Sequence, residues 1–144
     1  MRSKATEGRL SLLASLPVFA SCRGRELEAV DRLVDDIDVS AGEVLVREGV
    51  PGQESFVVVA GEARVTIDGR EIALLGPGDF FGEMSILDPG QPRSATVTAV
   101  TAMRLLVLDP RSFSTLVALP CVAHKVILGL IRRLRDAEVA ATSS

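Results

Sequence analysis

The stretch that decides the fold lies at residues 78–97 and reads GDFFGEMSILDPGQPRSATV. It follows a predicted strand that ends near Leu75 and precedes a predicted strand that starts near Ser94. The segment from Glu83 to Leu87 has room for about one and a half turns of helix. A short helix that starts after a glycine leaves backbone N–H groups unpaired and directed outward, which favours an anion. The stretch therefore predicts an anion site between two strands.

Two charged residues of this stretch, Glu83 and Arg93, indicate the chemistry of the ligand. A guanidinium with a neighbouring Ser94 hydroxyl and helix-end amides suits a singly charged phosphodiester. A carboxylate beside a phosphate makes sense if the ligand also carries a hydroxyl that donates to Glu83. The alternative is that Glu83 and Arg93 pair with each other as a structural ion bridge across the loop.

Outward from this stretch, residues 36–108 contain short β-branched runs that Gly and Pro turns interrupt. The turns recur about every 8–12 residues, which is typical of an antiparallel sandwich or barrel. The clearest hairpin joins residues 63–67 to residues 70–75 through Asp68-Gly69, a pair that favours a type I′ turn. The run Phe-Val-Val-Val at residues 56–59 predicts a strand with both faces covered.

Helical periodicity precedes the strands in residues 6–35. Four leucines between Leu10 and Leu16 predict a short helix that stops near Pro17. An apolar stripe from Leu27 to Val34 predicts a second, amphipathic helix.

Helical periodicity returns in residues 109–140. Asp109 can cap a helix and Pro110 fits its first position, and Pro120 starts the last helix. The apolar stripe of that helix runs from Val126 to Ala137 and suits either an ordinary core or a dimer seam. We expect part of it to pack on the strands and part on a second subunit, with a loose tail from residue 140 onward.

Length and composition restrict the classes of function. The 144 residues suit one domain, and the formal net charge of −3 argues against an electrostatic nucleic-acid binder. His124 is the single histidine, which removes most imidazole-based metal and nucleophile sites. The sequence contains no Walker loop, nucleophile elbow or metal cluster, so we expect neither an enzyme nor a metal or cofactor site.

The two cysteines, Cys22 and Cys121, lie far apart and have no neighbouring metal-ligand motif. We expect two free thiols in a reducing cytoplasm. The rival interpretation is a lipoprotein signal that ends at Cys22, but Glu7 and Pro17 interrupt its charged and apolar parts. No apolar run reaches the length of a membrane span, so no membrane partner is expected.

The segments GEMSIL at residues 82–87 and PRSATV at residues 92–97 resemble the phosphate-binding cassette of the cyclic nucleotide-binding domain. That family is the regulatory β-roll of the bacterial catabolite activator, cAMP-dependent kinase and cyclic-nucleotide-gated channels. Residues 16–19, 42–49 and 61–63 also resemble family motifs. The resemblance implies a mainly β, α+β fold over residues 1–144. In that fold an antiparallel β-roll, or double-stranded β-helix jelly roll, lies between N-terminal helices and two C-terminal helices.

The same resemblance assigns roles to individual residues. Glu83 would accept a hydrogen bond from the ribose 2′-hydroxyl, Arg93 would pair with the cyclic phosphate, and Ser94 would donate to phosphate or purine. The amides of Gly82 and Ala95 would line the same pocket. The implied ligand-binding set is Gly82, Glu83, Met84, Ser85, Arg93, Ser94 and Ala95.

In the family the final helix encloses the base. Because the chain has no Trp or Tyr to stack on a purine, Arg132, Arg133 and Arg135 are the candidates for a lid over the base. The alternative for these three residues is an ordinary solvated helix face.

The implied function is a regulatory module that senses cAMP, with cGMP as the alternative ligand, and signals through movement of its C-terminal helices. The competing hypothesis is a scaffold with a degenerate pocket that dimerises through residues 120–138. The sequence ends at Ser144, before the position of a helix-turn-helix in related transcription factors, so direct DNA binding is not expected unless the chain is a fragment of a longer protein. The output would then need an effector protein or a further effector domain.

Overall fold

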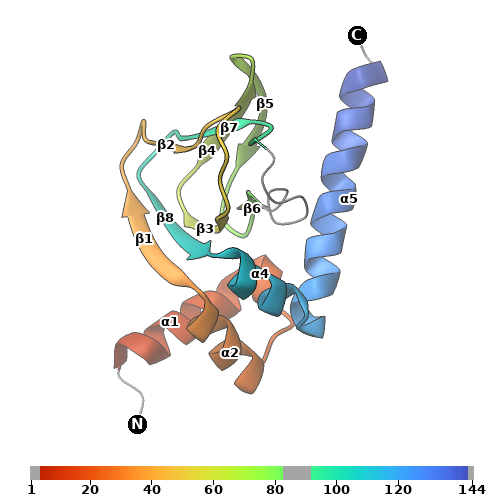
Figure 1. The fold of residues 1–144 in the computed structure, drawn as a ribbon. Coiled ribbons are helices and arrows are strands. Elements are labelled where there is room, and N and C mark those ends of the chain that lie inside the picture. Colours follow the sequence, from red (N-terminus) through yellow and green to blue (C-terminus); the bar gives the residue numbers. More distant parts are fainter. Residues whose placement is uncertain (1–3, 83–91, 143–144) are drawn as a thin grey trace.

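The computed structural model describes residues 4–82 and 92–142 and shows two antiparallel sheets between helices (Figure 1). The helical elements are α1 (Lys4–Ser15), the 3-10 helix η1 (Pro17–Phe19), α2 (Arg25–Leu33), α4 (Pro110–Val117) and α5 (Pro120–Thr142). The strands are β1 (Asp35–Val39), β2 (Val44–Val46), β3 (Ser55–Ala60), β4 (Ala63–Ile67), β5 (Arg70–Leu75), β6 (Phe80–Phe81), β7 (Thr96–Ala99) and β8 (Met103–Leu108). The predicted fold class, a β-roll with helices on both sides in sequence, is confirmed.

The eight described strands form two four-stranded sheets. One sheet has the order β1-β8-β3-β6 and the other has the order β2-β7-β4-β5. Every described pair is antiparallel, and the β4–β5 hairpin turns through Asp68 and Gly69 with φ angles of 51° and 77°. These angles confirm the predicted type I′ turn.

Strand β3 is buried on both faces because two separate apolar cores lie on either side of it. Phe56 and Val58 contribute to the core between the two sheets, whereas Val57 and Val59 face the core that includes helical residues. Within the first core, the ring of Phe56 stacks on Phe81 with centroids 4.7 Å apart. The predicted strand with both faces covered is therefore confirmed.

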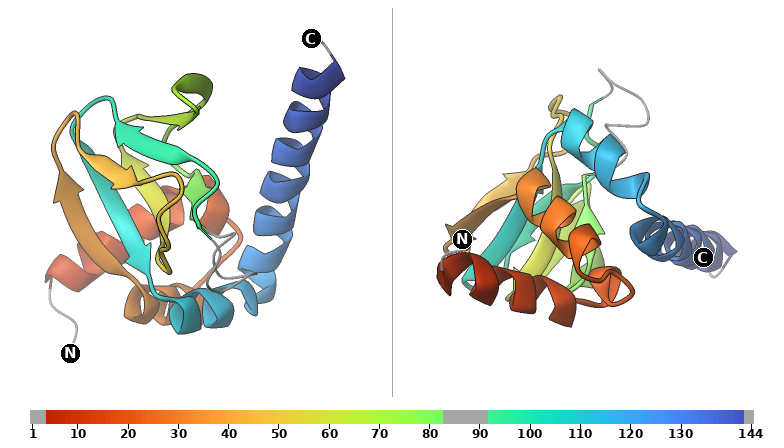
Figure 2. Two further views of the ribbon diagram at one scale, coloured as in Figure 1. Left: turned by 45° about the horizontal axis from the view of Figure 1, so that its top comes forward. Right: turned by 90° about the horizontal axis from the view of Figure 1, so that it is seen from below.

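Helices α1, α2 and α4 lie together at one end of the roll, which is clearest in the view from below (Figure 2). The C-terminal end of α2 is held by Arg9 of α1, whose Nη2 donates to the carbonyl oxygens of Asp31 and Val34 at 2.7 and 2.9 Å. These bonds satisfy carbonyl groups that a helix end leaves without an intrahelical partner. The chain then turns from α2 directly into β1.

Helix α4 begins as the sequence predicts. The side chain of Asp109 accepts a hydrogen bond from the Ser112 amide at 2.7 Å, and Pro110 occupies the first turn. This capping bond is the first cause of a lowered pKa for the exposed Asp109 carboxyl. The cap and the proline together fix the start of the helix.

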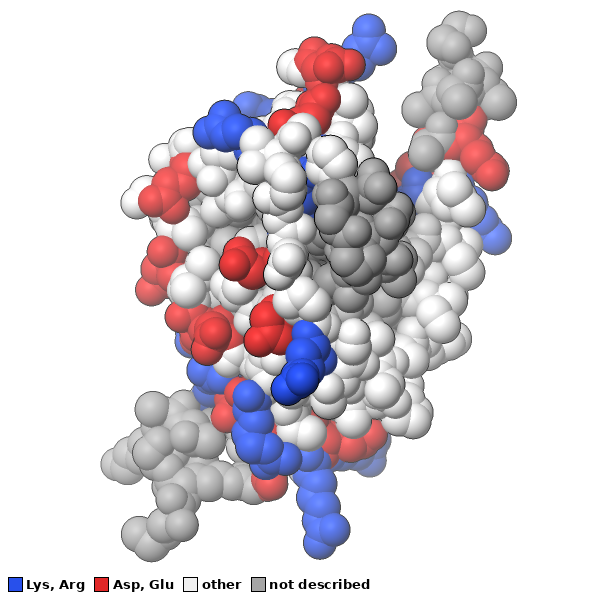
Figure 3. All heavy atoms as spheres, in the orientation of Figure 1, with Lys and Arg blue, Asp and Glu red and all other residues white. Residues whose placement is uncertain are grey.

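The buried residues of α5, among its described side chains, lie in its first turns. Val122 and Val126 are buried, but farther along the predicted stripe Ile127, Ile131 and Leu134 are exposed in this chain. Much of the α5 surface that faces the viewer in Figure 3 is uncharged. The expectation that part of the stripe packs on the roll is confirmed, while a second subunit over the rest stays a prediction. The expected loose tail is wrong for residues 140–142, which continue the helix.

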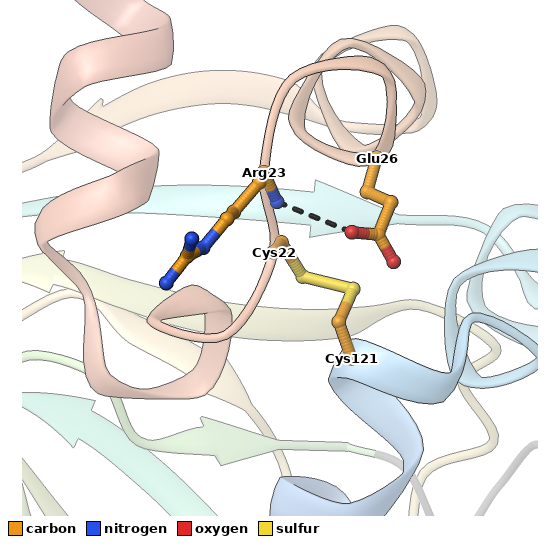
Figure 4. Close-up of a disulfide and its surroundings, with 4 residues drawn as sticks. All are labelled: Cys22, Arg23, Glu26 and Cys121. Carbon is orange, nitrogen blue, oxygen red and sulfur yellow. Dashed lines mark hydrogen bonds between the residues drawn. A yellow bond between two sulfur atoms is a disulfide. The ribbon is translucent and has the colours of Figure 1, made fainter.

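The prediction of two free thiols is wrong, because Cys22 and Cys121 form a disulfide across 99 residues (Figure 4). Cys22 lies between η1 and α2, and Cys121 lies in the first turn of α5, with their Cα atoms 5.1 Å apart. Packing of η1 against the start of α5 brings the two positions together. Sequence spacing carried no signal of this contact, which arises only in the folded chain.

Within residues 4–82 and 92–142, no single helix is long and apolar enough to cross a membrane. Helix α4 and residues 120–136 pass that test of length and composition only when taken together, as a pair bent by 103°.

Candidate functional site

The candidate site lies where the segment 92–95 returns to the roll beside β6. The backbone of Arg93 pairs with the segment before β3: its N–H donates to the carbonyl of Val50 at 3.1 Å, and its carbonyl accepts from Gly49 at 2.9 Å. An isolated bridge between Pro51 and Pro92 continues this pairing. The backbone of Arg93 is thus fixed, and only its side chain reaches toward β6.

The guanidinium of Arg93 is held by two backbone carbonyls. Its Nη1 donates to the oxygen of Gly82 at 2.9 Å, and its Nη2 donates to the oxygen of Glu54 at 2.8 Å. Both acceptors are main-chain carbonyl oxygens, and these two bonds orient the guanidinium. A partly buried, oriented guanidinium is a strong receptor for a phosphate or carboxylate.

Two glycines make room for this arrangement. A Cβ atom at Gly52 would lie 2.5 Å from Nε and 2.7 Å from Nη2 of Arg93. A Cβ atom at Gly82 would lie 2.7 Å from the carbonyl oxygen of Glu54, and Gly82 also has a φ of +85° that other residues rarely adopt. The guanidinium therefore lies between two stretches of backbone that only glycine brings this close.

A buried hydroxyl lies next to these groups. Ser55, the first residue of β3, is 1% exposed, and its Oγ has no hydrogen-bond partner among the described atoms. Ser55 lies close to Gly82, because its Cα atom would be 3.3 Å from a Cβ atom at Gly82. Buried hydroxyls without a partner are uncommon in folded proteins.

The structure brings together some of the residues that the sequence predicts for the site. Gly82 and Arg93 are in direct contact, Ser94 is exposed two residues before β7, and Ala95 is partly buried. Glu83, Met84 and Ser85 lie outside the described residues, as does the short helix predicted over residues 83–87. The roles of all these residues toward a ligand stay predictions.

The three candidate lid residues differ in position on α5. Arg133 is partly buried, with its Cζ 4.5 Å from the centroid of the Phe80 ring, whereas Arg132 and Arg135 are exposed. Arg133 contacts β6 through Phe80. Phe80 lies two positions before Gly82 in the chain.

The sequence reasoning missed Gly52 and Glu54 as parts of the site. Gly52 has no side chain that could mark a site, and Glu54 contributes its main-chain oxygen, which any residue type would supply. Nothing in the sequence links these positions to Arg93, since the contact depends on the pairing of residues 49–51 with residues 92–93. Among the residues that the structure describes, no group of His, Cys, Asp and Glu could hold a metal ion.

The two-sheet roll and the oriented arginine beside β6 are typical of a β-roll of the cyclic nucleotide-binding class. The chain belongs to the cyclic nucleotide-binding domain family, whose pattern matches residues 37–119, more than half of the sequence.

Curated relatives support this membership. The chain is 30% identical over 130 residues to the CRP-like cAMP-activated global transcriptional regulator of Mycobacterium tuberculosis, covering 86% of this chain and 58% of that protein. It is 41% identical over 104 residues to the cyclic AMP receptor protein of Thermus thermophilus, covering 68% of this chain and 48% of that protein. The chain spans about half the length of the curated relatives it matches.

Solved structures show the same fold. The Thermus thermophilus catabolite activator protein superposes with a TM-score of 0.74 at 35% identity, over 88% of this chain and 62% of that one. A cAMP-binding acyltransferase from Mycobacterium smegmatis superposes with a TM-score of 0.69 at 31% identity, over 82% of this chain and 38% of that one. The relatives thus carry regulatory cyclic nucleotide-binding domains, and the acyltransferase is also an enzyme.

Proposed function

We propose that this domain binds cAMP at Arg93 and that binding changes the position of α5. The observation that carries the proposal is the guanidinium of Arg93, which two main-chain carbonyls orient in the segment that resembles the family's phosphate-binding cassette. A cyclic phosphodiester is a monoanion, and a single oriented guanidinium matches its charge. The names of the bacterial relatives, which are cAMP-activated or cAMP receptor proteins, favour the same ligand.

The choice between cAMP and cGMP depends on contacts to the purine, so both nucleotides belong in the test. Isothermal titration of the chain with cAMP, cGMP and 5′-AMP compares two cyclic monoanions with an open, more highly charged phosphate. We expect saturable binding of cAMP and at least tenfold weaker binding of 5′-AMP, about 1.4 kcal/mol. Equal affinity for 5′-AMP would mean that the site recognises phosphate charge rather than a cyclic phosphodiester, and heat-silent mixing with all three would contradict the proposal.

A thermal-unfolding series provides an independent measurement. A ligand at about 100 times its dissociation constant adds about 2.7 kcal/mol to the stability of the folded state. We therefore expect cAMP to raise the unfolding temperature in a concentration-dependent way.

The regulatory output is proposed to lie in an effector protein or a further domain, with the module itself not acting as an enzyme. This division is consistent with relatives that are longer than the chain, which include a transcriptional regulator and a potassium channel. Cytoplasmic localisation remains a prediction.

A second candidate function, dimerisation through α5, is favoured by the exposed apolar residues Ile127, Ile131 and Leu134. Such side chains along one helix are typical of a surface that a partner covers. Sedimentation equilibrium over a concentration series would show a monomer–dimer equilibrium that Leu134→Glu shifts toward monomer. A monomeric wild-type chain at all concentrations would contradict this candidate.

A further inference from the structure

Helix α5 contains a glycine at the point where it crosses β6. A Cβ atom at Gly129 would lie 2.8 Å from Cε1 and 3.0 Å from Cζ of Phe80. Glycine weakens a helix interior relative to alanine, so its presence here has a cost to α5. The close approach of the Phe80 ring explains why a larger residue does not fit.

Arg133 lies one helical turn beyond Gly129, on the same face of α5. Its guanidinium carbon is 4.5 Å from the centroid of the same Phe80 ring, a cation–π distance. Two positions of α5 therefore contact one aromatic ring, the first by close packing and the second by electrostatic attraction.

The ring of Phe80 has little freedom to move on its own. It is 7% exposed and belongs to the core that includes Val57 and Val126. The backbone of Phe80 pairs with Val57 of β3. A displacement of β6 therefore moves the ring, and the ring in turn presses on α5.

Phe80 is also close to the candidate anion receptor along the chain. Two residues after it, the carbonyl oxygen of Gly82 accepts the hydrogen bond from Nη1 of Arg93. An anion that binds Arg93 competes with this carbonyl for the guanidinium and so changes the position of the segment that carries Phe80.

We propose that Phe80, Gly129 and Arg133 form the contact through which occupancy of the Arg93 site sets the position of α5. This inference rests on the proposed function, and in it Gly129 is a positioning residue that does not touch the ligand. A ligand shifts α5 only through a difference in its affinity for two positions of the helix.

The two ends of α5 differ in a way that suits a pivot at this contact. Before it, the helix is attached by the Cys22–Cys121 disulfide and by the fully buried Val122. Beyond it, Leu134 is 62% exposed and Val139 is 65% exposed. A shift at Gly129 therefore leaves the first turn in place and is amplified toward the C-terminal half.

The test compares Gly129→Ala with Gly8→Ala, a control in α1 where a Cβ atom meets nothing within 4 Å. Both changes replace a helical glycine, but only the first pushes against Phe80. Each protein is titrated with cAMP by calorimetry, and amide hydrogen exchange of residues 126–136 is measured without nucleotide and at saturation. Phe80→Leu replaces the ring on the other side of the contact by a smaller side chain. It provides a second variant if Gly129→Ala does not fold.

In the wild-type chain and in Gly8→Ala, we expect saturation with cAMP to change exchange across residues 126–136. In Gly129→Ala we expect binding at saturation with less than about one third of that change, because the added Cβ displaces α5 from the Phe80 ring before the nucleotide binds. Full retention of the change in Gly129→Ala, or in Phe80→Leu, would overturn the inference while leaving cAMP binding intact. Failure of the wild-type chain to bind cAMP would instead overturn the proposed function and the inference with it.

Discussion

At the scale of single residues, the position of the Arg93 side chain depends on a neighbouring glycine. Gly52 lies against the guanidinium of Arg93, and a Cβ atom there would be 2.5–2.9 Å from three of its atoms. No left-handed φ constrains Gly52, so the effect of a larger residue is steric alone. The neighbouring atoms belong to the end of a flexible side chain, which can move aside without disturbing the fold.

Gly52→Ala is therefore expected to separate binding from stability. The guanidinium should leave its position between the carbonyls of Glu54 and Gly82, and cAMP affinity should fall roughly 10- to 100-fold, as for loss of a charged hydrogen bond. The free energy of unfolding should change by less than about 0.5 kcal/mol. Gly76→Ala is the control, because a Cβ atom there meets nothing within 4 Å and its φ is unconstrained. Unchanged cAMP affinity in Gly52→Ala would contradict the placement of Arg93.

A second residue-scale feature lies in the β1-β8-β3-β6 sheet, between Asp36 of β1 and Arg104 of β8. Nε of Arg104 donates to both carboxylate oxygens of Asp36, at 3.0 and 3.2 Å. This hydrogen bonding lowers the pKa of Asp36 below its usual value of 3.8, outweighing the opposite effect of burial. Because the folded state binds the proton more weakly, the pair stabilises the protein above that pH and the effect is lost as the pH falls through the lowered pKa.

The pair predicts a pH-dependent difference between wild type and Asp36→Asn. Near pH 7 the variant should have a free energy of unfolding lower by about 0.5–1 kcal/mol, since Arg104 is partly solvated. Urea titrations at decreasing pH measure this difference in unfolding free energy. It should shrink as the pH falls below 3.8 and disappear once Asp36 is protonated in the folded wild-type chain. A difference in unfolding free energy that stays constant down to the lowest pH measured would show that the pair contributes nothing through its charge.

At the scale of elements, the disulfide joins the N-terminal helical region to the last helix. Cys22 follows η1 and Cys121 opens α5, so the bond closes a loop that contains the entire β-roll. A cross-link over a loop of this length stabilises mainly by restricting the unfolded chain. It also fixes the first turn of α5 relative to η1, whatever happens farther along the helix.

Cys121→Ser should lower the free energy of unfolding by about 2–4 kcal/mol under non-reducing conditions. A small dithiol reductant should lower the wild-type value to that of the variant and leave the variant unchanged. Denaturant titrations of both proteins with and without reductant make the comparison. Equal stabilities for all four samples would show that the bond does not form in solution.

The elements also show which parts of the fold the sequence could predict. The Asp68-Gly69 turn, the Asp109 cap and the buried run at residues 56–59 are local signals, and each is confirmed. The disulfide could not be predicted, because it depends on how η1 packs against α5. The same limit applies to Gly52, whose importance appears only when residues 49–51 pair with residues 92–93.

At the scale of the whole molecule, three parts meet beside β6. The two sheets position the Arg93 segment, the N-terminal helices and the disulfide hold the start of α5, and the outer half of α5 is left exposed. The family motif in residues 82–97 predicted that Arg93 would be central to the site, and Gly82 does contact it. The arrangement places a charged receptor next to a helix whose first turn is attached by the disulfide and whose outer described residues are exposed.

The most direct measurement is calorimetric titration of cAMP into the wild-type chain and into Arg93→Ala, with Arg70→Ala at the exposed β4–β5 hairpin as the control. We expect wild type and Arg70→Ala to bind one cAMP per chain with the same affinity. Arg93→Ala should bind at least about 100-fold more weakly, because it removes the charge partner of the phosphodiester. Thermal unfolding of the three proteins without nucleotide checks that each is folded. Equal cAMP affinity for folded Arg93→Ala and wild type would contradict the assignment of Arg93 as the receptor.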